Sequence, residues 1–284
     1  MIERPIAAAR ALLLSIFFIS VIGWSTATMA GHQYEGKSSL ADGDDGDVEY
    51  PNMMGDLKLQ ADLKFPDDVK GKVPAMIIAH GSGGVGYIEE NWAEFFQENG
   101  IALFVIDYFG PRDVDKNSSK QPMPTTDVTD ALKVLSTHPK IDPDRIGVIG
   151  FSRGAHLSVN SANLDADWGG GHALAAHVAL YPTCRRLSIT EGGSGAPVLV
   201  LIGTKDSYGK PEYCERLVQN AKNYKRDAKV IIYEGAYHAW DGDYSGSWYH
   251  RALDKQVELK SDYEITKKSR KDVLEFLKGP LKLK

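Results

Sequence analysis

RIGVIGFSRG, residues 145–154, places a serine between two glycines directly after a short apolar run. The run Ile146–Ile149 is typical of a buried parallel strand, and the residues after the serine favour a helix, so Ser152 falls in the turn between them. Gly150 and Gly154 have no Cβ, which lets strand and helix approach closely while the hydroxyl projects above the sheet. The pattern predicts a nucleophile elbow. The alternative is that Ser152 only caps the helix.

Short apolar runs alternate with helical stretches along most of the chain. The segment Asp56–Phe65 alternates apolar and polar residues, which predicts a strand at a sheet edge. Continuous runs predict strands covered on both faces, at 73–79, 101–106, 146–149, 178–181, 198–202 and 230–233. Helices are expected between most of them, at 90–98, 125–136, 155–163, 211–224 and 263–277. This order predicts one α/β domain over residues 56–284, with a doubly wound, mostly parallel sheet and helices on both faces.

The N-terminal part of the chain has a different composition. Arg4 and Arg10 precede an apolar run, and Thr28-Met29-Ala30 offers small residues at both positions that a signal peptidase inspects. We expect residues 1–30 to be a cleaved signal peptide, so that the protein is exported to the periplasm or secreted and keeps no membrane span. A retained anchor is the alternative, although the apolar core is shorter than the roughly 20 residues of a bilayer span. Residues 31–55, rich in Gly, Asp and Ser, are expected to form a flexible lead-in.

Charge and composition exclude some classes of partner. The chain is 43% hydrophobic with a net charge of −5, as in ordinary globular proteins. Lysine and arginine form no long run that offsets the acidic balance, so we expect no nucleic-acid partner. The eight histidines are scattered and no H-E-x-x-H motif occurs, so we expect no metal site.

The chain contains two cysteines, Cys184 and Cys214. Export would deliver them to an oxidising compartment, where an even count commonly means a bridge. We therefore expect a disulfide between them, which in the chain-entropy model would stabilise the fold by roughly 3 to 4 kcal/mol. Two buried free thiols are the alternative.

Three polar side chains of complementary chemistry follow predicted strands, at the carboxyl ends where such a sheet places its chemistry. They are Ser152, Asp206 and His238, in that order along the chain. A serine hydroxyl is a weak nucleophile until an imidazole accepts its proton, and the imidazole needs a carboxylate to fix its tautomer. A helix-capping Asp206 and a merely structural His238 are the alternatives. The joint occurrence in this order favours a Ser-His-Asp triad.

A hydrolase of this kind also needs donors for the oxyanion of its tetrahedral intermediate. The elbow supplies the backbone N–H of Arg153, and the glycine-rich loop His80–Gly84 (HGSGG) supplies a second, which we expect to be that of Ser82.

The same loop has a second interpretation. Residues 81–86 match G-x-G-x-x-G, and Asp107 ends the next predicted strand, as in a dinucleotide-binding site. This alternative leaves the three strand-end residues without a role.

Four segments together carry a family resemblance: HGSGG at 80–84, GFSRG at 150–154, GTKD at 203–206 and YHAW at 237–240. With these segments the chain resembles the dienelactone hydrolase-like family of α/β-hydrolases over residues 55–277. The resemblance implies Ser152 as nucleophile, Asp206 as acid and His238 as base, with Ser82 and Arg153 as oxyanion donors and no cofactor. The YPTC segment at 181–184 and Cys214 also resemble the family's secreted and related members.

The chain departs from the family's namesakes at the nucleophile. Those enzymes use a cysteine, whereas position 152 is a serine. In this respect the chain looks more like the family's carboxylesterases, which cleave esters through an acyl-enzyme.

Candidate substrate-binding residues lie near these motifs. The segment Asp107–Arg112 resembles the family's loop beside the active site, which makes Arg112, together with Arg153, a candidate for binding a substrate carboxylate. Tyr108, Trp92 and Trp240 are candidates for an apolar pocket wall. Solvated arginines and core aromatics are the alternatives.

The sequence thus predicts an exported serine hydrolase that cleaves a small-molecule carboxylic ester or lactone without a cofactor. A non-catalytic binding protein on the same scaffold is the alternative from another class.

Overall fold

The computed structural model describes residues 36–116, 118 and 120–284. The described residues belong to one compact unit, His32–Lys284. The expected signal peptide, residues 1–30, lies outside them. Across the described ranges, no helix combines the length and apolar character that crossing a bilayer requires.

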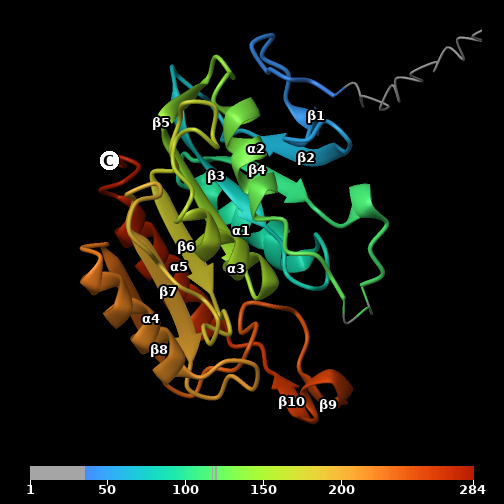
Figure 1. Ribbon diagram of the computed structural model, residues 1–284, viewed down its shortest axis with the longest axis vertical. Helices are drawn as coiled ribbons and strands as arrows, with labels where there is room; N and C mark the ends of the chain where they lie inside the picture. The colour runs from blue at the N-terminus through green and yellow to red at the C-terminus, as the bar shows by residue number, and fades with distance from the viewer. Residues whose placement is uncertain (1–35, 117, 119) are drawn as a thin grey trace, which may run out of the picture. The chain divides into compact units, whose positions relative to one another are not determined.

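An eight-stranded sheet forms the centre of the domain, in the order β1-β2-β4-β3-β5-β6-β7-β8 (Figure 1). The first two pairings, β1 with β2 and β2 with β4, are antiparallel, and all those from β4 to β8 are parallel. The strands are β1 (Gly46–Pro51), β2 (Lys58–Lys64), β3 (Val73–Ala79), β4 (Ala102–Asp107), β5 (Ile141–Phe151), β6 (Ala176–Leu180), β7 (Val198–Gly203) and β8 (Ala228–Tyr233). The predicted doubly wound, mostly parallel α/β architecture is confirmed.

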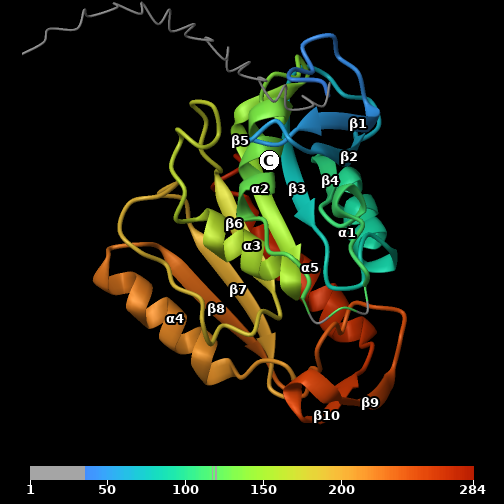
Figure 2. The same ribbon diagram turned by 45° about the vertical axis from the view of Figure 1, so that its right-hand side comes forward.

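Helices cover both faces of the sheet (Figures 1 and 2). They are α1 (Tyr87–Glu98), α2 (Thr125–Leu135), α3 (Arg153–Ser161), α4 (Pro211–Asn223) and α5 (Tyr263–Leu277). On one face α1 and α5 lie together, with the Arg270 guanidinium 5.6 Å from the centre of the Trp92 ring. The other three helices cover the opposite face. All five predicted helices are present, with ends shifted by a few residues.

Two predictions about the N-terminal segments of the domain are wrong. Residues 46–51, assigned to a flexible lead-in, form strand β1, which pairs with β2 over its whole length. Val48 and Tyr50 of β1 are buried, and their alternation with Asp47 and Glu49 is a short strand signal in a polar segment. The predicted edge strand at 56–65 is therefore the second strand, β2.

A separate two-stranded sheet was not predicted. It pairs β9 (Gly246–His250) with β10 (Lys255–Leu259) in antiparallel fashion, as a hairpin. Both strands are largely exposed and carry few apolar residues, so neither shows the buried-run pattern that identified the main sheet. In Figure 1 the hairpin lies beyond the end of the main sheet where the parallel strands terminate.

A fully buried histidine lies in the centre of this fold. His177 on β6 is 0% exposed, and its ring contacts Ser158, Ser161 and Ser194. Burial lowers the pKa of His177 to about 3, because the charged imidazolium would lose its hydration. The native state therefore binds the proton less readily than the unfolded chain, and stability falls as pH decreases from about 6.5 toward 3.

We predict that His177→Gln removes part of this acid sensitivity. Between pH 7 and pH 5 the wild type should lose about 2 kcal/mol of unfolding free energy through this histidine, a loss that the variant lacks. Urea denaturation of both proteins at the two pH values measures the difference. Equal losses would show that His177 does not resist protonation.

Candidate active site

The turn that carries Ser152 is a strained, tightly packed strand-to-helix connection between β5 and α3. Ser152 has φ +50° and ψ −104°, a conformation that residues other than glycine rarely adopt. A Cβ on Gly150 would lie 2.0 Å from the carbonyl oxygen of Gly154, and one on Gly154 would lie 2.0 Å from that of Ala79. Glycine is therefore required at both positions, and the predicted elbow geometry is present.

The three predicted strand-end side chains form one hydrogen-bonded row. His238 Nε2 lies 2.9 Å from Ser152 Oγ, and His238 Nδ1 lies 2.8 Å from Asp206 Oδ2. This arrangement fits the tautomer in which Nδ1–H donates to the carboxylate and Nε2 accepts from the hydroxyl. The Asp206 side chain is fully buried, and that of His238 is 6% exposed.

Local backbone contacts hold the acid and the base in place. Asp206 Oδ1 accepts hydrogen bonds from the backbone N–H groups of Tyr208 (2.7 Å) and Gly209 (2.9 Å), which fixes the carboxylate plane. The loops after β7 and β8 approach closely, since a Cβ on Gly203 would lie 2.1 Å from the carbonyl oxygen of Ala236. The sheet thus brings residues 32 positions apart into contact.

The two residues predicted to supply the oxyanion donors are in contact through their side chains. Arg153 Nε donates to Ser82 Oγ over 3.1 Å, so the glycine-rich loop after β3 touches the elbow. A Cβ on Gly81 would be 3.4 Å from the carbonyl oxygen of Phe151, which places the loop against the end of β5. Within the described part of the chain, the backbone N–H groups of Ser82 and Arg153 donate to no protein acceptor.

Ser152 lies in a cavity of about 620 Å³ that also includes Ser82, Arg153 and His156. Residues of the β9–β10 hairpin and its turn form one side, with Trp248, Tyr249 and Leu253 all partly exposed. Burial lowers the pKa of His156 to about 4, and its Nε2 accepts a hydrogen bond from the backbone N–H of Thr183. His156 is therefore neutral at neutral pH.

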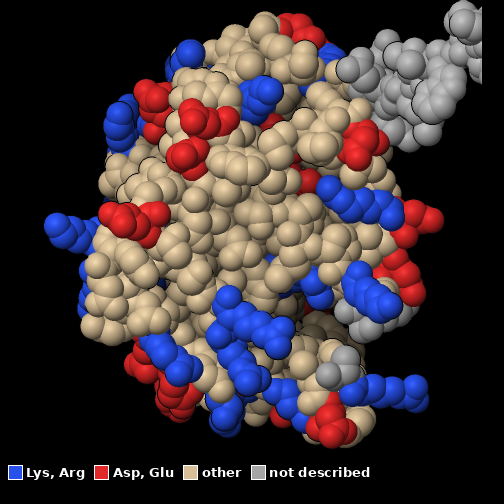
Figure 3. Space-filling view, viewed as in Figure 1, with Lys and Arg blue, Asp and Glu red and all other residues tan. Residues whose placement is uncertain are grey.

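The cavity is positively charged although the chain is acidic. Its lining includes Lys116, Arg153 and Arg251 and no aspartate or glutamate. None of these three cations has a carboxylate partner within the described residues. Figure 3 shows several basic side chains over the lower part of the face, beside the position of the hairpin in Figure 1.

Four of the predicted substrate-binding residues do not line this cavity. Arg112 forms two hydrogen bonds to the Asp127 carboxylate, at 2.7 and 2.8 Å, so its guanidinium is already neutralised within the protein. Tyr108 and Trp240 are 0% exposed and belong to the core. The Tyr108 hydroxyl donates to the carbonyl oxygen of His80, and Trp240 Nε1 donates to Ser269 Oγ. The same holds for Trp92, which is fully buried.

A buried network behind His238 was not predicted. Asp241 is 5% exposed and accepts hydrogen bonds from Trp92 Nε1 (2.7 Å) and the Tyr181 hydroxyl (2.8 Å). The Tyr181 ring packs edge-on against the His238 imidazole, with ring centres 4.8 Å apart. Burial raises the pKa of the Asp241 carboxyl. Its position three residues after His238 was the one sequence signal for this network.

The expected disulfide between Cys184 and Cys214 is present. It joins the loop after β6, which carries Tyr181 and Thr183, to the first turns of α4. Two segments beside the row of Ser152, His238 and Asp206 are thereby linked covalently.

The glycine-rich loop does not favour the dinucleotide alternative. Glu89 in the first turn of α1 accepts hydrogen bonds from the N–H groups of Gly81 and Gly86, donors that a phosphate would need. The Asp107 carboxylate accepts from the N–H groups of Phe109 and Gly110 and lies 3.4 Å from His80 Nε2. The loop donors and the strand-end carboxylate that a dinucleotide site would use are thus already bonded within the protein.

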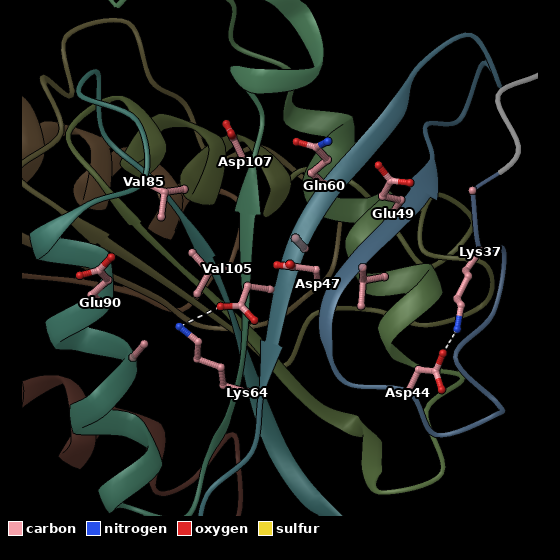
Figure 4. A pocket seen from close by; sticks show the side chains of 15 residues that line it. Lys37, Asp44, Asp47, Glu49, Gln60, Lys64, Val85, Glu90, Val105 and Asp107 are labelled. Carbon is pink, nitrogen blue, oxygen red and sulfur yellow. Dashed lines mark hydrogen bonds and ion pairs between the residues drawn. The ribbon is translucent and has the colours of Figure 1, made fainter.

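Another cavity, of about 700 Å³, lies away from Ser152 (Figure 4). Figure 4 shows Glu90 of α1 and Val85 on one side of it, and Asp47 and Glu49 of β1 on the other. Its lining includes six carboxylates, and the two lysines there form ion pairs with neighbouring aspartates. Nowhere in the described ranges do three or more histidine, cysteine or acidic side chains form a group suited to hold a metal ion.

A family model described as the dienelactone hydrolase family matches residues 59–279. The chain belongs to this family. The match includes every residue of the hydrogen-bonded row, and it agrees with the resemblance that the motifs carry. The description of this family is that of hydrolases.

Solved structures with the same fold include two types of hydrolase. A putative dienelactone hydrolase from Klebsiella pneumoniae superposes with a TM-score of 0.64 at 19% identity, over 82% of this chain and 98% of the other. The propionate-bound esterase of Thermogutta terrifontis superposes with a TM-score of 0.61 at 14% identity, over 84% and 94%. At these identities the likeness shows the α/β-hydrolase fold.

Curated relatives match shorter stretches. A polyketide transferase of Stachybotrys chlorohalonatus and a thiohydrolase of Aspergillus aculeatus are each 32% identical over 123 residues, 42% of this chain. These matches span 40% and 37% of the relatives' own lengths. A probable 2-oxo-3-(5-oxofuran-2-ylidene)propanoate lactonase of Bradyrhizobium is 24% identical over 197 residues, 61% of this chain and 75% of that protein.

Proposed function

We propose that the protein hydrolyses a carboxylic ester or lactone through an acyl-enzyme on Ser152. The observation that carries this proposal is the row in which Ser152 Oγ, the His238 ring and Asp206 lie within hydrogen-bonding distance. A hydroxyl paired with an imidazole, itself oriented by a buried carboxylate, is the arrangement that activates serine for acyl transfer.

The proposed reaction proceeds in two halves. As Ser152 Oγ attacks the carbonyl carbon, its proton passes to His238 Nε2, and the carbonyl oxygen becomes an oxyanion facing the N–H groups of Ser82 and Arg153. The intermediate then collapses, and the imidazolium gives its proton to the departing alkoxide. Water then attacks the acyl-enzyme while His238 accepts its proton. As this second intermediate collapses, the imidazolium returns the proton to Ser152 Oγ and the carboxylic acid is released. In a lactone the alcohol freed in the first half stays covalently attached to the acyl group, so that the second half releases a single hydroxy acid.

The cavity supports a substrate that carries a negative charge. Arg153 is half-buried, and burial lowers the pKa of its guanidinium. A desolvated cation without a carboxylate partner is costly, and an anionic substrate would compensate it. One relative fits this proposal. The Bradyrhizobium protein is described as a probable lactonase whose substrate is a propanoate, which carries a carboxylate.

We predict that Ser152→Ala and His238→Ala each lower kcat/KM for p-nitrophenyl esters by roughly 10³-fold or more, because the two side chains act as a unit. Initial rates across esters of graded chain length, with a few lactones, measure the effect. His172→Ala, which changes a histidine that does not line the cavity, is the matched control. Near-normal rates in either triad variant would overturn the assignment. A wild type that turned over no ester or lactone would favour the non-catalytic alternative.

We predict a preference for anionic substrates. Of two p-nitrophenyl esters matched in size, the one whose acyl chain ends in a carboxylate should show the higher kcat/KM, and the difference should shrink as salt screens the cations. The double variant Lys116→Gln, Arg251→Gln should reduce this ratio by about tenfold through the loss of two charges. Equal selectivity in variant and wild type would contradict the charge preference.

We further propose that the protein is exported with its disulfide formed, as the bridge and the N-terminal composition favour. Expressed with its whole N-terminus in a bacterium, the chain should leave the cytoplasm and begin close to residue 31. Its two cysteines should react with maleimide only after reduction. A full-length cytoplasmic chain with two free thiols would contradict export.

A further inference from the structure

A buried carboxylate that takes no part in the proposed proton transfers lies beneath the glycine-rich loop. Glu89 is the third residue of α1 and is 4% exposed. Its Oε1 accepts a hydrogen bond from the backbone N–H of Gly81 at 3.1 Å, and its Oε2 accepts one from Gly86 at 3.0 Å. One side chain therefore binds both ends of the loop that connects β3 to α1.

Capping of helix α1 accounts for only one of these two hydrogen bonds. A residue three positions into a helix commonly accepts from the N-cap N–H, which here is that of Gly86. The bond to Gly81 is different, because Gly81 lies five residues before the N-cap, on the far side of the loop. That second bond fixes the segment next to Ser82.

Other contacts hold His80 at the start of the glycine-rich loop. The position of Ser82 depends on the residues next to it in the loop and on Arg153 and Gln121. The Tyr108 hydroxyl donates to the carbonyl oxygen of His80, and the two rings stack with centres 3.9 Å apart. Gly84 N–H donates to the carbonyl oxygen of Gly81, which closes a turn around Ser82 and Gly83. Ser82 itself is exposed in the cavity, and contacts to its side chain and carbonyl come from Arg153 and Gln121.

We propose that Glu89 is a positioning residue for the oxyanion hole, whose carboxylate holds the peptide of Gly81 so that the following N–H, that of Ser82, faces the oxyanion. The proposal rests on the proposed function. An oxyanion donor is effective only if it is oriented before charge develops, so a loop held at both ends stabilises the transition state more than the bound substrate. Burial raises the pKa of Glu89, and the two N–H donors together with the helix N-terminus offset part of that cost.

An amide cannot replace the Glu89 carboxylate, because both of its oxygens accept a hydrogen bond from a backbone N–H group. In Glu89→Gln one acceptor oxygen remains, while the new NH₂ group must face a backbone N–H, so donor opposes donor. The variant should lose the bond to Gly81 or to Gly86 while the volume of the side chain is retained.

The matched control is Glu90→Gln. Glu90 is the next residue on α1, and the variant removes the same charge from the same turn. Its side chain is exposed and lines the separate cavity of Figure 4, away from the loop donors. Both variants and the wild type are compared in kcat and KM for an uncharged p-nitrophenyl ester, and in the rate of inactivation by a fluorophosphonate. Inactivation also places negative charge on an oxygen in the oxyanion hole.

We expect Glu89→Gln to lower kcat by about tenfold or more, with KM changed less than threefold and the phosphonylation rate reduced in parallel. Glu90→Gln should match the wild type in all three. Glu89→Asp, which keeps the charge but shortens the side chain, should fall between them and serves if the amide variant does not fold. Unchanged kcat in Glu89→Gln, or a loss confined to KM, would overturn the inference while leaving the proposed function intact. A wild type that neither turns over ester nor reacts with the fluorophosphonate would instead contradict the proposed function.

Discussion

The close approach of the start of α3 to the ends of β3 and β5 is the constraint on which the rest of the site depends. It is possible because Gly150 and Gly154 present no Cβ where backbone atoms lie about 2.0 Å from the position that a Cβ would take. This packing forces Ser152 into its positive φ and lifts its side chain above the sheet. The imidazole, the carboxylate and the glycine-rich loop are all arranged around that one hydroxyl.

The sheet explains why residues so distant in sequence meet. Parallel strands end at the same edge, so the segments that follow β3, β5, β7 and β8 converge there. Each then needs its own local support. The Tyr208 and Gly209 N–H groups orient Asp206, the Tyr181 ring packs against His238, and Glu89 binds both ends of the loop around Ser82. These contacts hold the site's side chains and the glycine-rich loop in place.

The sequence predicted those parts of the fold that have a strong local signal. Continuous apolar runs located six of the eight strands of the main sheet, apolar alternation located a seventh, and the glycine spacing located the elbow. Strand β1 was missed because its two buried residues alternate with acidic ones in a short polar segment. The β9–β10 hairpin was missed because its largely exposed strands lack the pattern of a buried run. The sequence also did not predict which side chains are paired or buried through tertiary contacts. Arg112 is paired with Asp127, and Tyr108 and Trp240 are buried, for reasons that only the assembled core determines.

The central claim is that Ser152 carries the acyl group during turnover. The most direct measurement mixes the protein with an excess of a p-nitrophenyl ester, stops the reaction with acid within milliseconds to seconds, and determines the mass of the intact protein and of its peptides. The account predicts a mass increase of one acyl group, located on the peptide that contains Ser152 and lost when turnover is complete. Ester cleavage without any acylated protein, or an acyl group on another residue, would contradict it.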